Sequence, residues 1–186
     1  MSVNITPPAA DAAIIRVSFD IDQVSSDLLW QAAVAKTHRD LYSPVGRYAG
    51  AVHFREGDTV SVEVTGFGRS GTLLSTNILD AMLYTVPHTS GERFSAPSPF
   101  SSVRATTPIE QWQPARIEHD REPGFSASVQ HSLTPLTVVQ DDGRWKLSLI
   151  LTVVIERLTK AGPQQEIRVF SFDPEAEVGS GTEPPV

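Results

Sequence analysis

The chain has 186 residues, of which 40% are hydrophobic, and this length suits one substantial core better than two full domains. It contains no cysteine, which excludes disulfides, thiolate metal sites and a cysteine nucleophile. The net charge of -7 and the lack of a basic tract argue against nucleic acid as a partner, because phosphates would be repelled on average.

The sequence shows no pattern typical of a cleavable signal or of a membrane-spanning segment. The first residues, MSVNITPPAADAA, have no basic segment before an apolar run. The most apolar stretch, Leu147 to Ile155, is far shorter than the roughly 20 residues that a membrane-spanning helix needs. We therefore expect a cytoplasmic protein with no membrane association. Its expected parts are an N-terminal extension over 1–12, a single β-sandwich domain over 13–178 and a tail over 179–186.

The first element is predicted as a strand from Ala13 to Asp22, because apolar and polar residues alternate along it. The next is predicted as a short helix that begins at an N-capping Ser26 and ends near Lys36. Its basis is a stripe of leucines and alanines at helical spacing.

Gly46 to Gly66, reading GRYAGAVHFREGDTVSVEVTG, is predicted as an antiparallel hairpin. Its turn is Glu56-Gly57-Asp58, in which glycine tolerates positive φ and the aspartate can cap neighbouring amides. In the second arm three valines face the core, and Ser61, Glu63 and Thr65 are expected to face water.

The remaining elements are also predicted as strands. Asn77 to Val86 forms one, although a helix competes there, and short edge strands at Ser102 to Thr106 and Ala115 to Glu118 interrupt a proline-rich stretch. The last third contains an alternating strand from Phe125, a hairpin at Asp141-Asp142-Gly143, a central strand over Trp145 to Ile155 and a closing strand over Glu166 to Phe172. The predicted fold is mainly β: an antiparallel β-sandwich of about seven to nine strands with one short helix.

Carboxylates at strand ends give one candidate site. Asp20 and Asp22 lie at the end of the first strand, and Asp173 follows the closing strand. If those ends are neighbours, three hard oxygen ligands could bind calcium. The alternative is that the carboxylates are simply solvated.

Aromatic residues in the proline-rich stretch give a second candidate site. Trp112 and Phe100, with Phe94 beside them, could bind a sugar or a protein if the loops expose them. Packing onto the sandwich is the alternative. The five histidines, His38, His53, His88, His119 and His131, show no metal-binding spacing and are expected to be dispersed on the surface.

No catalytic motif is present. Ser70 lies in GRSG, which lacks the spacing of a nucleophile elbow, and no phosphate-binding glycine pattern occurs. An enzyme is therefore not expected. A hydrolase built from dispersed Ser, His and Asp residues stays as an alternative, to be favoured only if folding brings such residues together in a pocket.

Three blocks of the sequence resemble the PixA/AidA family of bacterial inclusion-body and quorum-sensing-associated proteins. They are IIRVSFDID, the block SPVGRYAGAVHFREGDTVSVEV, and the closing RVFSFDPEAEVG with Phe170, Phe172, Asp173 and Pro174. The resemblance implies a compact β-sandwich, no established enzymology and links to host interaction. It also implies possible carbohydrate binding, since some members look like carbohydrate-binding proteins. With two methionines the chain departs from the methionine-rich inclusion-forming members.

The leading functional hypothesis is a non-enzymatic PixA/AidA-like protein that binds a partner or ligand, with a glycan as one candidate. Its context would be host interaction or quorum-sensing-controlled physiology. A self-assembling structural or inclusion protein is the first alternative, and it predicts a homo-oligomer built on exposed sheet edges. The hydrolase is the second.

Overall fold

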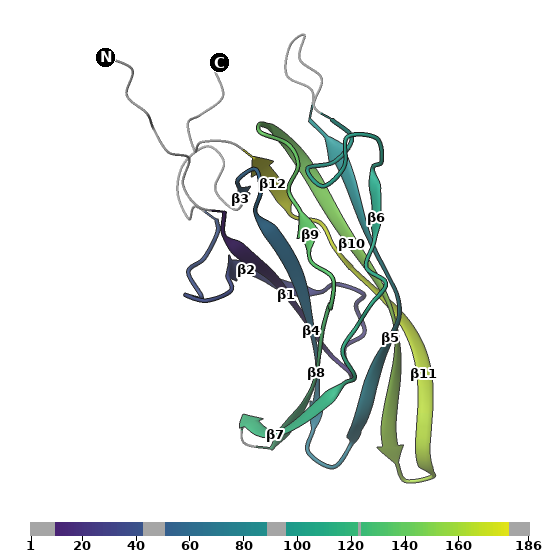
Figure 1. Cartoon of the computed structure of the whole chain (residues 1–186). Coiled ribbons are helices and arrows are strands. Elements are labelled where there is room, and N and C mark those ends of the chain that lie inside the picture. The colour runs from purple at the N-terminus through teal and green to yellow at the C-terminus, as the bar shows by residue number, and fades with distance from the viewer. Residues whose placement is uncertain (1–9, 43–50, 89–95, 123, 179–186) are drawn as a thin grey trace, which may run out of the picture.

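Figure 1 shows a computed structural model of the chain, which describes residues 10–42, 51–88, 96–122 and 124–178. These residues form twelve strands, arranged in two six-stranded sheets, and no helix. It follows that the described chain has no helix that could span a membrane. The prediction of a mainly β protein is confirmed, with more strands than expected.

The first sheet, called sheet A, has the strand order β2-β1-β4-β8-β7, and β9 pairs with β4 as well. Its strands are β1 (Ala12–Asp20), β2 (Leu29–Val34), β4 (Thr59–Arg69), β7 (Arg116–Glu122), β8 (Phe125–His131) and β9 (Leu136–Thr137). All neighbours in sheet A are antiparallel except β1 and β4, which are parallel.

The second sheet, called sheet B, has the order β3-β12-β10-β5-β6, and β11 pairs with β10 beyond β12. Its strands are β3 (Val52–Phe54), β5 (Leu73–Pro87), β6 (Thr106–Pro108), β10 (Gly143–Thr159), β11 (Gly162–Phe172) and β12 (Glu175–Val178). The pair β3 and β12 is parallel and the others are antiparallel. Both sheets are therefore mixed, which corrects the expectation of a purely antiparallel architecture.

One hydrophobic core joins the inner faces of the two sheets. The alternation predicted for β1 and β10 is confirmed, since both inward sets are buried: Ala13, Ile15, Val17 and Phe19 from β1, and Trp145, Leu147, Leu149, Leu151, Val153 and Ile155 from β10. The rings of Phe19 in sheet A and Phe170 in sheet B stack with their centroids 4.3 Å apart. Side chains of both sheets thus form a single cluster.

The predicted helix between Ser26 and Lys36 is wrong, because this segment contains β2. Trp30 pairs with Val17 and Ala32 pairs with Ile15, so β2 follows the inward alternation of β1. Leu29, which was assigned to the apolar stripe of the helix, points outward and is exposed. The apolar residues of this segment fit the spacing of a helix and that of a strand. Pairing with β1 makes it a strand, since tertiary context often overrides local propensity.

Both predicted hairpin turns connect one sheet to the other instead of closing a hairpin. β3 lies in sheet B while β4 lies in sheet A, and β9 lies in sheet A while β10 lies in sheet B. Alternation identifies each strand but carries no information on which strand it pairs with. β10 and β11 do form a hairpin, which turns at Lys160-Ala161.

The chemistry predicted for the Glu56-Gly57-Asp58 turn is confirmed, and the turn also has partners that are distant in sequence. Gly57 has a φ of 85°. The buried Asp58 carboxylate accepts hydrogen bonds from the amides of Asp11 at 2.7 Å and Arg55 at 2.8 Å. The Gly57 amide donates to the Val138 carbonyl at 2.9 Å. These hydrogen bonds attach the turn to the residue before β1 and to the residue after β9.

Side chains and loops close several sheet edges. On β5, the amide of Thr76 donates to Ser128 Oγ at 3.1 Å and that of Ile78 to Gln130 Oε1 at 3.2 Å, so β8 covers this edge. Ser128 and Gln130, the polar residues that alternate with Ala127 and Val129, are buried. At one end of β11, the Ser171 amide donates to the Ser26 carbonyl at 2.8 Å, and its carbonyl accepts from Leu28 at 2.9 Å.

The predicted strand over Asn77 to Val86 is confirmed as part of the longer β5. The two short edge strands are found as β6 and β7, shifted toward the C-terminus by one to four residues at either end. Phe94, Gly46 to Gly50, most of the predicted extension 1–12 and the tail 179–186 lie outside the described residues.

Replacing Gly57 with valine should destabilise the protein by about 1 kcal/mol or more, because a β-branched residue is disfavoured at positive φ. A Cβ at this position would have room, since its nearest neighbour is Ala10 Cβ at 3.5 Å, so the backbone conformation alone causes the loss. Chemical denaturation of Gly57→Val and Gly57→Asn separates the cost of a β-branched residue at positive φ from the cost of adding a side chain at this position. Asparagine tolerates this region and should cost less. Equal stability of wild type and Gly57→Val would contradict the assignment.

Glu156 on β10 should titrate below the usual glutamate value of 4.5. Hydrogen bonds from Ser75 Oγ, at 2.7 Å, and from Gln165 stabilise the carboxylate and lower its pKa. A lowered pKa means that this contribution to stability is present above pH 4.5 and is lost as the pH falls through the folded-state pKa. An NMR titration should show the Glu156 pKa rising in Ser75→Ala and unchanged in Ser61→Ala, where the lost hydroxyl is in sheet A. A Glu156 pKa unmoved by Ser75→Ala would refute this account.

Candidate functional site

A row of polar side chains crosses the outer face of sheet A. Strand register places Gln31 of β2 opposite Arg16 of β1, Arg16 opposite Glu63 of β4, and Glu63 opposite His131 of β8. These positions alternate with the inward apolar residues of the same strands, so all four point away from the core. Strands that are distant in sequence thus bring a cation, a carboxylate, an imidazole and an amide into one line.

Glu63 is the centre of this row. Its Oε1 lies 3.4 Å from Arg16 Nε, and its Oε2 lies 3.5 Å from His131 Nδ1. Its side chain is 14% exposed and that of Arg16 is 24% exposed, so water screens this pair less than an ordinary surface pair. Arg16 Nη2 also lies 2.9 Å from His38 Nδ1.

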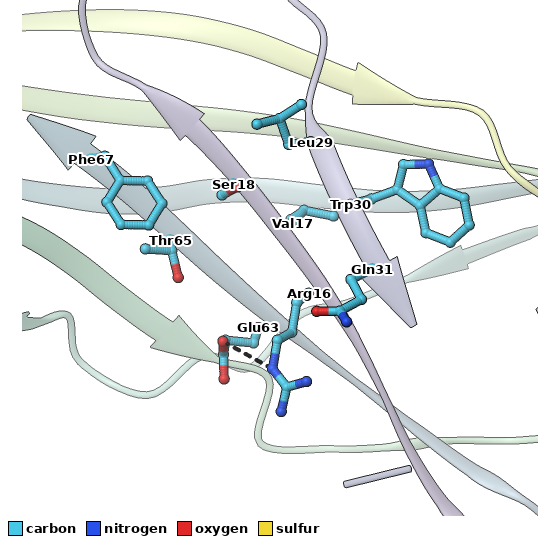
Figure 2. Close-up of a pocket in the computed structure, with 9 residues that line it drawn as sticks. All are labelled: Arg16, Val17, Ser18, Leu29, Trp30, Gln31, Glu63, Thr65 and Phe67. Carbon is cyan, nitrogen blue, oxygen red and sulfur yellow. Dashed lines mark ion pairs between the residues drawn. The ribbon is translucent and has the colours of Figure 1, made fainter. Parts of the chain in front are cut away.

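Next to this row the surface is hollowed into an open pocket of about 410 Å³. Figure 2 shows the Arg16–Glu63 ion pair at one end and the Phe67 ring beside Thr65 at the other. The nine lining residues come from β1, β2 and β4: Arg16, Val17, Ser18, Leu29, Trp30, Gln31, Glu63, Thr65 and Phe67. The Trp30 ring points away from the ion pair in the same view and packs against Phe172 with centroids 5.6 Å apart.

The lining combines chemically different groups over a short distance. Arg16 offers guanidinium donors, Glu63 a carboxylate acceptor, and Gln31 an amide that does both. Ser18 and Thr65 add hydroxyls, while Leu29 and Phe67 supply apolar surface. A pocket with a few convergent polar groups on an apolar wall suits a small ligand that carries several hydroxyls and one apolar face.

The expectation that Ser61, Glu63 and Thr65 form a solvated face is wrong for two of the three. Thr65 is buried, and the Glu63 side chain is mostly enclosed by its partners. The sequence did not reveal that Arg16 and Glu63 are neighbours, because β1 and β4 pair in parallel across a long insertion. A clue was present in the single arginine of β1 and the single glutamate of β4, each surrounded by apolar neighbours.

The three aspartates of the predicted calcium site each have other partners. Asp20 Oδ1 accepts a hydrogen bond from the Asp22 amide at 2.8 Å. Asp22 pairs with Arg157 at 3.2 Å, and Asp173 lies 3.5 Å from Lys146 Nζ. Within the described ranges, no three acidic or histidine side chains gather as metal ligands would. The calcium site stays a prediction from sequence.

Trp112 and Phe100 are both partly buried against the core. The Trp112 indole donates to the Ile109 carbonyl at 2.9 Å, and the Phe100 ring lies 6.1 Å from that of Phe54, centroid to centroid. Each therefore uses much of its surface in packing. They do not line the sheet A pocket.

Two histidines join the row on sheet A, and a third contacts a serine elsewhere. His38 and His131 flank Arg16 and Glu63, as described above. His119 Nδ1 lies 3.2 Å from Ser126 Oγ, which in turn lies 3.5 Å from Ser70 Oγ. Ser126 is 1% exposed, so a substrate carbonyl has no access to its hydroxyl. This pair does not meet the condition of nucleophile and base in a pocket.

The Arg16–Glu63 pair should contribute a coupling of roughly 0.5–1 kcal/mol to the free energy of unfolding, because it is partly shielded from water. A double-mutant cycle with Arg16→Met and Glu63→Gln measures this coupling by urea denaturation. Added salt should reduce it. The exposed pair Lys146–Asp173 serves as the control and should give a smaller coupling. A coupling no larger than that of the control would show that enclosure by the sheet adds nothing.

Comparison with known proteins gives a likeness to solved structures. No family model matches the chain, and the curated proteins likewise give no match. The chain is similar to the crystal structure of an inclusion body protein (PixA) from Burkholderia cenocepacia J2315, with 10% sequence identity and a TM-score of 0.36. The match covers 93% of this chain and 98% of that one. This neighbour carries the name of the family that the sequence resembles.

Proposed function

We propose that the chain is a non-enzymatic ligand-binding β-protein that takes a small polyhydroxylated ligand, such as the end of a glycan, in the sheet A pocket. The observation that carries the proposal is the enclosed Arg16–Glu63 pair, which borders a hollow shared with the Phe67 ring. Sugars present hydroxyls that donate and accept, together with an apolar face of C–H groups. The pocket has a partner for each.

The charge balance of the pocket favours a neutral ligand. Arg16 is already paired with Glu63, so the lining holds one cation and one carboxylate that form an ion pair. An anionic ligand would have to compete with Glu63 for the guanidinium. A hydroxyl can accept from Arg16 and donate to Glu63 at once, and hydrogen bonds to charged groups contribute more than neutral ones.

The same lining favours binding over catalysis. Glycoside hydrolysis ordinarily needs two carboxylates on either side of the scissile bond. The nine residues around the pocket include one carboxylate, that of Glu63, and its two oxygens already face Arg16 and His131. A general acid and a separate nucleophile or base are not both supplied by this set. The pocket can hold a sugar without the means to cleave it.

The resemblance to PixA/AidA proteins suggests a biological context for the proposed ligand binding. Members of that family are linked to host interaction and to quorum-sensing-controlled physiology. A glycan-binding role for this chain is consistent with contact between a bacterium and the glycans of a host or of another cell. This part of the proposal rests on the motifs in the sequence.

A glycan array, followed by calorimetry on any hit, tests the proposal. Glu63→Gln removes a charged acceptor while keeping the shape of the pocket, so it should weaken binding about tenfold or more, which is about 1.4 kcal/mol. Glu156→Gln makes the same chemical change on the outer face of sheet B and should leave binding unchanged. An array without hits, or a hit that Glu63→Gln does not weaken, would contradict the proposed site.

Running the array with and without calcium separates the two candidate sites. Binding in the sheet A pocket should not require calcium. A signal that requires calcium, that Asp20→Asn abolishes and that Glu63→Gln spares would move ligand binding from the pocket to the strand-end aspartates.

A further inference from the structure

One long strand edge of sheet B is open among the described residues. β11 pairs with β10 on one side, and on its other side only the end near Ser171 is bonded, to residues 26–28. Between Pro163 and Ser171 no strand from the described part of the chain covers this edge. In Figure 1 this part of the β10–β11 hairpin forms one border of the molecule.

The backbone alternation of β11 shows which groups face outward. The Ser171 amide and carbonyl both bond to the 26–28 segment, so they point away from β10. In an antiparallel pair every second residue points the same way. The amides and carbonyls of Gln165, Ile167 and Val169 therefore point to the open edge, and so does the nitrogen of Pro163, which has no hydrogen to donate.

The open stretch of β11 is symmetric about Ile167. Pro163 ends it on one side and the already bonded Ser171 ends it on the other. The outward-facing residues between them are Gln165, Ile167 and Val169, with Ile167 in the middle. An antiparallel partner of identical sequence, related by a two-fold axis at Ile167, would satisfy every one of these outward groups.

Other edges of the two sheets are covered or charged. The edge of β2 bonds to the segment after it, since the Leu41 amide donates to the Ala32 carbonyl at 3.0 Å. Ser128 and Gln130 cover β5, and β7 carries the sequence RIEHDRE, whose charges disfavour pairing. The β11 edge instead exposes Ile167 by 66% and Val169 by 52%.

The side chains of β11 also complement themselves across such an axis. With Ile167 opposite its own copy, Gln165 lies opposite Val169, and Glu166 lies opposite Arg168. The arrangement places the Glu166 carboxylate, which also pairs with Arg157 of its own copy, near the Arg168 guanidinium, which also donates to the Ile21 and Ser25 carbonyls. This contact occurs on each side of the axis, on the face opposite to Ile167. Opposite charges across a strand pair stabilise it, and a shift by two residues in either direction would break both pairs.

We propose that two copies of this chain associate through antiparallel pairing of β11 with β11, with the two-fold axis at Ile167. The pairing forms about six intermolecular backbone hydrogen bonds and joins the two sheets B into one continuous sheet. The exposed Ile167 and Val169 then meet Ile167 and Gln165 of the other copy. Such a contact is isologous, so it closes at a dimer.

Light scattering and sedimentation from micromolar to millimolar protein give the first test. The wild type should form a dimer. Ile167→Lys should shift it to monomer, because a charge on the edge opposes pairing, while Val86→Lys should remain a dimer. Val86 is a matched control, since it is 60% exposed and lies on β5 of the same sheet. Thermal melts confirm that both variants are folded.

The absence of cysteine allows a test of the register by single replacements. In Ile167→Cys the two Cα atoms would lie about 5.5 Å apart, which is within disulfide range. Gln165→Cys should not cross-link with itself, because its copies would be roughly 13 Å apart at the strand rise, but it should cross-link with Val169→Cys when the two are mixed.

A wild type that stays monomeric at millimolar concentration would overturn the proposal. So would an Ile167→Lys dimer as stable as the wild type, or loss of the dimer in Val86→Lys. A mixture in which Gln165→Cys prefers itself to Val169→Cys would overturn the register.

Discussion

The structure depends on one constraint, the burial of a single side of β10. Six residues from Trp145 to Ile155 keep the same parity, and all are almost completely enclosed. To bury them, β10 must have neighbours on both edges and a second sheet over its inner face. β5, β11 and β12 supply the neighbours, and β1 and β4 supply the covering sheet. A slip of one residue would turn all six side chains to solvent, so the register of sheet B is strongly specified.

The two outer faces left by this arrangement differ in character. Sheet A presents a row of charged and polar groups centred on Glu63, with apolar surface beside it. The outer face of sheet B presents isoleucine and valine side chains along β10 and β11. The proposed ligand site lies on the outer face of sheet A, and the proposed dimer contact lies at the β11 edge of sheet B, so the two proposals use different surfaces.

What could be predicted from the sequence follows from the range of the interactions involved. Strands such as β1, β5 and β10 were found because alternation is local, and the Gly57-Asp58 turn was found because its chemistry is local. Pairing is not local. β3 and β4 looked like two arms of a hairpin, yet each pairs in parallel with a strand far away in sequence. The helix prediction for the Leu29–Val34 segment was wrong for a different reason, since its apolar spacing fits a helix and a strand alike.

The candidate site was missed for the same reason. Glu63 and Arg16 were each assigned to a solvated face, which is correct for an isolated strand. Their enclosure arises only when β1, β4 and β8 lie side by side. The predicted aromatics, Trp112 and Phe100, were identified from their position in loops, and the core takes part of their surface. Sequence composition gave the chemical groups, and topology decided which of them meet.

The crossing turns at Gly57 and at Asp141-Asp142 also bear on how the chain folds. Successive strands pass from sheet B to sheet A and back, so neither sheet is encoded by one continuous segment. Neither half of the sequence holds a complete sheet, and most native contacts join residues far apart along the chain. Folding must close long loops before those contacts stabilise anything, which is characteristic of slow, highly cooperative β-proteins. The strand that organises the core, β10, is the tenth of the twelve described strands, so the strands before it in the chain gain their central partner only when β10 is present.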